Sequence, residues 1–269
     1  MLAEPEHAIG VFDSGVGGLT VLRELQRQLP YEPLVYLGDT ARVPYGTKSP
    51  QTVLRYAQEA ARFLTAQRVK LLVVACNTAS AVALSTLAET YRLPVVGVIE
   101  PGACRALDVS RNRRIGVIGT EGTIRSGAYE RALKASDPTV EVYAVSCPLF
   151  VPLAEEGWMN HPSAEMIAAD YLAPLLNQGV DTLVLGCTHY PLLKQTLQRV
   201  AGPDVQLIDS AEETAKVVAG ELYSRSLQRS AAESLPPRYF VTDIPDRFER
   251  VGGSFLGAPL CGVTTVSLD

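Results

Sequence analysis

The sequence lacks the features of several common protein classes. Its 269 residues contain no run of about 18 uncharged apolar residues, so we expect no transmembrane helix. It has only three histidines and five cysteines, and no two cysteines form a C-x-x-C pair. That scarcity argues against a His-built metal site, a zinc knot and a disulfide framework. The net charge is -5 and there is no long basic run, so we expect no nucleic-acid partner.

The remaining composition is that of an ordinary globular protein. Apolar residues make up 47% of the chain and charged residues 20%, and the length suits one large domain or two of moderate size. Glu4, Glu6 and His7 precede the first apolar run, which fits no signal peptide. We therefore expect a cytoplasmic protein that does not associate with membranes.

Short apolar runs alternate with stretches in which apolar residues recur at helical spacing, as at Leu19, Leu22, Leu25 and Leu29. The short runs are almost entirely apolar, as in strands that are buried on both faces of a parallel sheet. This alternation predicts an α/β fold with mostly parallel sheets. The predicted strands cover residues 9–12, 34–38, 71–75, 95–98, 115–119, 140–145, 182–186, 205–208 and 239–242.

The two halves of the chain resemble each other. IGVFDS begins at Ile9 and IGVIGT at Ile115, and a later apolar run in each half leads into a cysteine, Cys76 or Cys187. The offsets between matched segments are nearly equal and their order is the same, which predicts two similar, pseudo-symmetric α/β domains. In such a pair, the active site is expected in the cleft between the domains.

Two segments could carry the chain from one domain to the other. EPG begins at Glu100, and DSAEE begins at Asp209. We therefore predict a first domain of residues 1–99 with a returning C-terminal segment, residues 210–269. The second domain would be residues 100–209.

Polar residues follow several predicted strands, at the place where ligands bind in open α/β sheets. DSGVGG matches neither the dinucleotide-binding nor the Walker A pattern, but its backbone amides could hold a carboxylate. Asp13 within it could be a catalytic residue or a helix N-cap. The four segments concerned are FDSGVGG, GDTARVPYG, ACNTAS and GCTHYP.

Cys76 and Cys187 stand at equivalent strand ends, each before a predicted helix. A helix N-terminus stabilises a thiolate, so this position predicts a lowered thiol pKa. Either cysteine alone could be a small buried apolar residue, and His189 could be a structural histidine. The other three cysteines look structural: Cys104, Cys147 and Cys261.

Two thiols that face one pocket suit few reactions. A redox pair and a Cys–His nucleophile that uses His189 are both possible. A two-base proton transfer needs one base on each face of a carbon acid, and two facing domains supply that geometry. Lys48 is the only lysine near the candidate loops, and it looks like a solvated surface residue rather than a Schiff-base lysine. We therefore expect neither a cofactor nor a metal.

The motifs resemble those of the bacterial glutamate racemase family, which makes D-glutamate for peptidoglycan. GVFDSGVGGLTVLREL, GDTARVPYGTKS, ACNTASA, LGCTHYPLL, CPLFVPLAEEG and YFVTDIPDRF occur in the order and spacing of that family. The resemblance extends from about Ile9 to Leu256 and implies two α/β domains with the substrate between them. It also implies a cofactor-independent isomerase and a homodimer.

The resemblance assigns roles residue by residue. Cys76 and Cys187 are the expected acid/base thiols, with Asp13 as the helper of Cys76, and His189 and Glu155 as helpers of Cys187. Glu156 is adjacent, so it competes with Glu155 for that role. Thr120, the counterpart of Ser14 in the internal repeat, is a further candidate. The expected substrate contacts are Asp13, Ser14, Tyr45, Gly46, Asn77, Thr78, Thr188 and His189.

Other readings of the same motifs stay open. An aspartate racemase of the same superfamily would share both cysteines, and a non-catalytic regulatory protein could retain the fold. A thiol oxidoreductase would form a reversible Cys76–Cys187 disulfide. For substrate binding we expect neutral donors rather than a clamp by Arg42.

Overall fold

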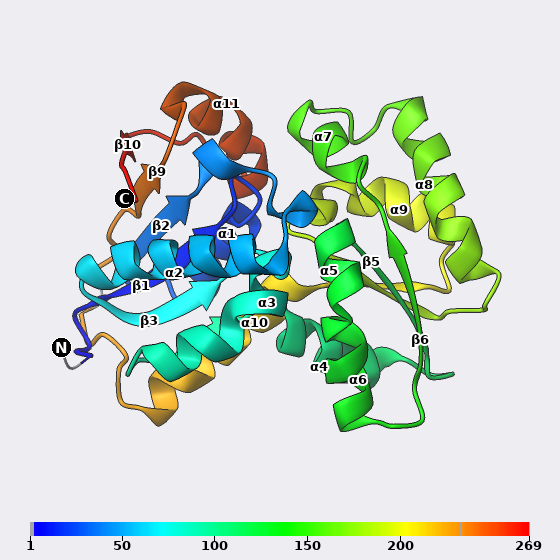
Figure 1. Cartoon of the computed structure of the whole chain (residues 1–269), viewed down its shortest axis with the longest axis horizontal. Helices are drawn as coiled ribbons and strands as arrows, with labels where there is room; N and C mark the ends of the chain where they lie inside the picture. Colours follow the sequence, from blue (N-terminus) through cyan, green and yellow to red (C-terminus); the bar gives the residue numbers. More distant parts are fainter. Residues whose placement is uncertain (1–2, 232, 269) are drawn as a thin grey trace.

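The computed structural model describes residues 3–231 and 233–268, which form two parallel sheets covered by helices on both faces (Figure 1). This arrangement confirms the predicted α/β class. The first sheet has the order β10-β9-β2-β1-β3-β4 and the second β6-β5-β7-β8. Strands β2-β1-β3-β4 and β6-β5-β7-β8 therefore repeat one order, as the similarity between the two halves of the sequence predicted.

The strands of the first sheet are β1 (Ala8–Asp13), β2 (Leu34–Gly38), β3 (Val69–Val74), β4 (Val95–Gly97), β9 (Arg238–Val241) and β10 (Val263–Thr265). Those of the second sheet are β5 (Arg114–Gly119), β6 (Glu141–Ser146), β7 (Thr182–Gly186) and β8 (Gln206–Asp209). All neighbouring strands pair in parallel.

Alternate side chains of each strand of the first sheet pack on opposite layers of helices, which explains the uninterrupted apolar runs. Ile9 and Val11 of β1 face one layer and Phe12 faces the other, and all three are fully buried. One layer consists of α1 (Leu19–Gln28), α10 (Ser210–Ser224) and α11 (Pro245–Leu256). The other consists of α2 (Pro50–Ala66) and α3 (Asn77–Thr90).

The second sheet is enclosed in the same way. Ile115 and Val117 of β5 face one layer of helices, whereas Ile118 faces the other. The first layer contains α4 (Ile99–Val109) and α6 (Ala128–Ser136). The second contains α7 (Phe150–Glu155), α8 (Pro162–Leu176) and α9 (Lys194–Ala201), and the short helix α5 (Glu121–Ser126) follows β5.

Both ends of the described chain lie in the lobe that contains the first sheet (Figure 1). Helix α10 follows β8 of the second sheet but packs on the first, beside α1. The proposed domain limits, 1–99 with 210–269 and 100–209, stay a prediction, and residues 1–2, 232 and 269 lie outside the described part. Within that part, every helix is too short or too polar to span a bilayer.

The structure differs from the sequence-based expectation at three places. Strand β10 was not predicted, because it is a short edge strand whose residues are mostly exposed. Helix α1 ends at Gln28, so Leu29 lies outside it. The chain after Cys187 first forms a 3₁₀ turn, Tyr190–Leu193, and α9 begins only at Lys194.

Candidate active site

The carboxyl ends of the central strands of both sheets meet at one cavity. Cys76 follows β3 and is the N-cap residue of α3, and Cys187 directly follows β7. Both thiols line this cavity, and every site residue predicted from the sequence lines it except Asp13. The predicted residues brought together there are Ser14, Tyr45, Gly46, Cys76, Asn77, Thr78, Thr120, Glu155, Cys187, Thr188 and His189.

The two halves of the molecule are in close contact around the cavity. A Cβ atom on Gly17 would lie 2.2 Å from Oγ1 of Thr188, and one on Gly46 would lie 2.6 Å from Cβ of Thr120. Any side chain at these two positions would force the halves apart. The cavity measures about 40 Å³, which is room for very few water molecules. The cavity is therefore narrow in this structure.

On the Cys187 side, a chain of polar contacts leads from the sulfur to the surface. Nδ1 of His189 lies 3.9 Å from the Cys187 sulfur, and Nε2 lies 3.1 Å from Oε1 of Glu155. The other Glu155 oxygen accepts a hydrogen bond of 3.1 Å from Arg247 of α11. Glu155 rather than its exposed neighbour Glu156 thus contacts the histidine.

These contacts make His189 a cation at neutral pH. Burial alone would lower the pKa of His189, but its hydrogen bonds to Cys187 and Glu155 and the negative charge nearby raise the pKa to about 10. The same hydrogen bond from His189 lowers the pKa of Glu155, and Arg247 acts in the same direction. A positive charge therefore lies 3.9 Å from the Cys187 sulfur.

The Cys76 side differs in its electrostatics. The Cys76 thiol donates to Oγ of Ser14 at 3.8 Å. Burial, together with the negative charge of Asp13, raises the pKa of Cys76 to about 12, although the amide of Ala79 and the Ser14 hydroxyl oppose this effect. The expectation of a lowered pKa at this position was wrong. The reason is that loss of hydration outweighs the favourable helix N-terminus at a fully buried sulfur.

Asp13 lies behind the cavity and is almost completely buried. Its carboxylate accepts a hydrogen bond of 2.9 Å from the amide of Gly15 and one of 3.4 Å from the hydroxyl of Thr188. Burial raises the pKa of Asp13, while His189 and the backbone amides lower it. Asp13 does not cap α1, whose N-cap is Gly18. The amides of the DSGVGG loop thus hold the carboxylate of the loop itself.

Three threonine hydroxyls form a cluster at the edge of the cavity, between the two halves. Oγ1 of Thr78 lies 2.9 Å from that of Thr120 and 3.2 Å from that of Thr123. The hydroxyls of Thr120 and Thr123 are 3.0 Å apart. Thr123 was missed in the sequence because α5 is too short to give a periodic signal. Its place three residues after Thr120, the N-cap of α5, was the available clue.

The loop after β2 is held in place by hydrogen bonds to Asp39, which is fully buried. The carboxylate of Asp39 accepts hydrogen bonds from Tyr45, from Arg42 at 2.7 Å and from Thr242 at 2.9 Å. Arg42 also pairs with Glu59 and stacks on the ring of Tyr56. Arg42 is thus engaged within the protein and does not line the thiol cavity.

The charged groups that line the cavity are few. Among the described residues that surround it, there is no lysine and no arginine. Lys48 lines a separate small cavity with Arg125. No group of three or more His, Cys, Asp and Glu side chains in the described ranges is arranged to hold a metal ion. The acid and base groups among the described residues at the cavity are therefore the two thiols, His189, Glu155 and the Tyr45 phenol, which is engaged with Asp39.

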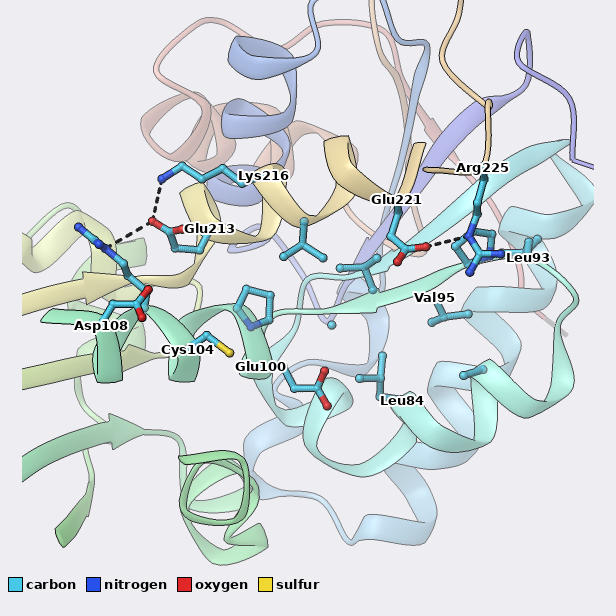
Figure 2. A pocket seen from close by; sticks show the side chains of 17 residues that line it. Leu84, Leu93, Val95, Glu100, Cys104, Asp108, Glu213, Lys216, Glu221 and Arg225 are labelled. Carbon is cyan, nitrogen blue, oxygen red and sulfur yellow. Dashed lines mark hydrogen bonds and ion pairs between the residues drawn. The ribbon is translucent and has the colours of Figure 1, made fainter. Parts of the chain in front are cut away.

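A much larger cavity of about 690 Å³ lies between α3, α4 and α10 (Figure 2). The thiols Cys76 and Cys187 do not line it. Several of its charged side chains pair with each other: Lys216 with Glu213 at 2.9 Å, and Arg225 with Glu221 at 2.8 Å. Because it lies away from the strand ends that carry the thiols, we assign the chemistry to the small, narrow cavity.

The remaining cysteines do not all fit a structural role. Cys147 is buried, as expected for a small apolar core residue. Cys104, which lines the larger cavity, and Cys261 are exposed, so neither is a buried core residue.

Known proteins resemble the chain over almost its whole length. The model of the Asp/Glu/Hydantoin racemase family matches residues 9–218. Glutamate racemase of Geobacter metallireducens is 59% identical, and the match covers 98% of each chain. The crystal structure of glutamate racemase from Francisella tularensis in complex with D-glutamate superposes with a TM-score of 0.93 and 39% identity, over 98% of this chain and 99% of that one. Glutamate racemase from Thermus thermophilus in complex with β-chloro-D-alanine gives a TM-score of 0.90 and 46% identity, over 98% of both chains.

Proposed function

The chain belongs to the Asp/Glu/Hydantoin racemase family, and from this premise we propose that it interconverts L- and D-glutamate by moving a proton between Cys76 and Cys187. The observation that carries the proposal is the pair of thiols at equivalent strand ends of the two halves, both facing one narrow cavity. Relatives named glutamate racemase at high identity over nearly the full chain support glutamate as the substrate.

The proposed reaction removes one proton from Cα of glutamate and adds one proton to the opposite face of the same carbon. A thiolate on one side takes the proton from Cα of glutamate, and the electron pair of the broken C–H bond moves toward the carboxylate. The thiol on the other side then donates its proton to the opposite face of Cα. The product is the other enantiomer, and the two sulfurs have exchanged their protonation states.

The electrostatics support a resting state in which Cys76 keeps its proton. The pKa of Cys76 is raised to about 12, and the cation of His189 lies 3.9 Å from the Cys187 sulfur. The high thiol pKa also has a chemical use, because a thiolate formed at Cys76 is a strong base toward a weakly acidic carbon. The helpers proposed for Cys187 are His189 and Glu155, and the helper proposed for Cys76 is Asp13.

Substrate binding is proposed to use neutral donors. The hydroxyls and backbone amides at the cavity can donate hydrogen bonds to the α-carboxylate and so stabilise the negative charge that develops on it. The proposed substrate contacts are Asp13, Ser14, Tyr45, Gly46, Asn77, Thr78, Thr120, Thr188 and His189, and all but Asp13 line the cavity.

The test is incubation of L-glutamate with dialysed protein in heavy water, without pyridoxal phosphate or metal, followed by chiral chromatography. We expect D-glutamate that carries deuterium at Cα. L-Aspartate in a parallel sample distinguishes an aspartate racemase. If a folded sample with reduced thiols neither forms D-glutamate nor exchanges the Cα proton, the proposal is wrong, and a non-catalytic role on this fold becomes the alternative.

Replacement of Arg42 by alanine separates a structural role from a substrate clamp. We expect the KM for glutamate to change less than about tenfold, because Arg42 is held by Asp39 and Glu59. The melting temperature should fall, since the buried Asp39 loses a charged partner. Steady-state kinetics and thermal melting measure the two effects, and a hundredfold rise in KM would overturn the neutral-donor proposal.

Three broader expectations stay predictions, and those of peptidoglycan synthesis and a homodimer rest on the resemblance. The D-glutamate is proposed to serve peptidoglycan synthesis, and the protein is proposed to be cytoplasmic. A homodimer is also proposed, which light scattering of the purified chain tests directly.

A further inference from the structure

Tyr129 of α6 is a buried tyrosine that the sequence motifs did not single out. Only 3% of its surface is exposed. Its phenol donates a hydrogen bond of 2.7 Å to Oδ1 of Asn77, the residue directly after Cys76. The bond joins the two halves of the molecule, because α3 covers the first sheet and α6 the second.

The ring of Tyr129 is fixed by close contacts. A Cβ atom on Gly186, the residue before Cys187, would lie 3.0 Å from Cε2 of Tyr129. One on Gly102 of α4 would lie 3.7 Å from Cε1 and from the phenol oxygen. The absence of a side chain at Gly186 leaves room for the ring, and Gly102 lies at ordinary contact distance from it. Tyr129 therefore touches the residue that follows one thiol and the residue that precedes the other.

The hydrogen bond decides which end of the Asn77 amide faces Tyr129. The two ends of an asparagine amide have the same shape, so only hydrogen bonding selects between them. Burial raises the pKa of Tyr129, which keeps the phenol protonated and able to donate. In the structure, Oδ1 faces Tyr129 and the NH2 group points elsewhere.

The NH2 group of Asn77 makes no hydrogen bond within the described part of the chain. Nδ2 is buried and has no hydrogen-bond partner among the residues that the structure describes. Only 3% of the surface of Asn77 is exposed, and Asn77 lines the thiol cavity. An unpartnered buried donor is costly unless a ligand satisfies it. A carboxylate oxygen in the cavity is a suitable acceptor.

We propose that Tyr129 is a positioning residue, which holds the amide of Asn77 so that its NH2 group donates to a carboxylate of the substrate. The inference rests on the proposed glutamate racemisation. Tyr129 touches no reacting atom and acts only through Asn77. Without its phenol, the amide is free to turn its oxygen toward the substrate carboxylate, where the two oxygens repel each other.

The experiment compares Tyr129→Phe with the wild type, with Asn77→Ala and with the double variant. Tyr129→Phe keeps the packed ring and removes only the phenol oxygen. We expect its KM for glutamate to rise about tenfold, whereas kcat changes much less, because the lost contact binds the substrate before and during reaction. In the Asn77→Ala background, the same change should have no further effect on KM.

A matched control is Tyr190→Phe. Tyr190 is also fully buried, and its phenol donates at 2.9 Å to the main-chain carbonyl of Cys147 instead of to a side-chain amide. The Tyr190→Phe variant should have a lower melting temperature than the wild type and an unchanged KM for glutamate. An unchanged KM in Tyr129→Phe, or equal effects with and without Asn77, would overturn the inference. If the wild type itself does not racemise glutamate, the proposed function fails instead.

Discussion

Replacement of either Cys76 or Cys187 by alanine is expected to lower the kcat of glutamate racemisation by at least ~10³-fold. Each thiol supplies the only acid or base proposed for one face of Cα. With one thiol missing, the proton can leave from one face, but no group can return it on the other. The remaining thiol cannot compensate, because it lies on the opposite side of the cavity in the proposed mechanism.

The loss should not come from unfolding. Both thiols are 6% exposed and line a cavity, so alanine removes one sulfur from an existing space instead of emptying a packed core. Chiral chromatography gives the rate, and circular dichroism verifies the fold. Cys104→Ala, which removes an exposed thiol away from the site, should leave the rate unchanged. Turnover within tenfold of the wild type by either variant would refute the two-thiol mechanism.

The sequence predicted the fold and the members of the cavity because both depend on local signals. Apolar runs identified nearly every strand, and polar residues after those runs had to meet where parallel strands end. Cys76 and Thr120 could be placed in this way, since each lies within two residues of a strand end. The edge strand β10 could not, because its residues are mostly exposed and give no apolar run.

Properties that depend on three-dimensional packing could not be predicted from the sequence. The pKa of Cys76 rises because of burial and the charge of Asp13, and neither the burial nor the distance is visible in the motif. The roles of Asp39 and Tyr129 depend on partners that lie far away in the chain. For Tyr129, the only local feature is an ordinary amphipathic helix, which does not distinguish a core tyrosine from one that orients a neighbour.

Replacement of His189 by asparagine is expected to reduce kcat/KM for glutamate by roughly 10²-fold. His189 is the cation beside the Cys187 sulfur, and its pKa of about 10 keeps it protonated at neutral pH. Asparagine removes this positive charge from beside the sulfur that is proposed to exchange the Cα proton. Glu155→Gln should act in the same direction with a smaller loss, because Glu155 reaches the sulfur only through His189. Glu156→Gln is the matched control, since Glu156 is exposed and does not contact His189.

The equilibrium between L- and D-glutamate constrains the expected effect of His189→Asn on kcat/KM. L- and D-glutamate have equal free energies in achiral solution, so the equilibrium constant is unity and kcat/KM must be the same in both directions. His189→Asn must therefore lower kcat/KM for both enantiomers by one factor, although Cys187 acts as base in only one direction. The individual kcat values need not change equally. Initial rates from each pure enantiomer test this, and a near-normal kcat/KM from either one would show that His189 does not assist the proton transfer.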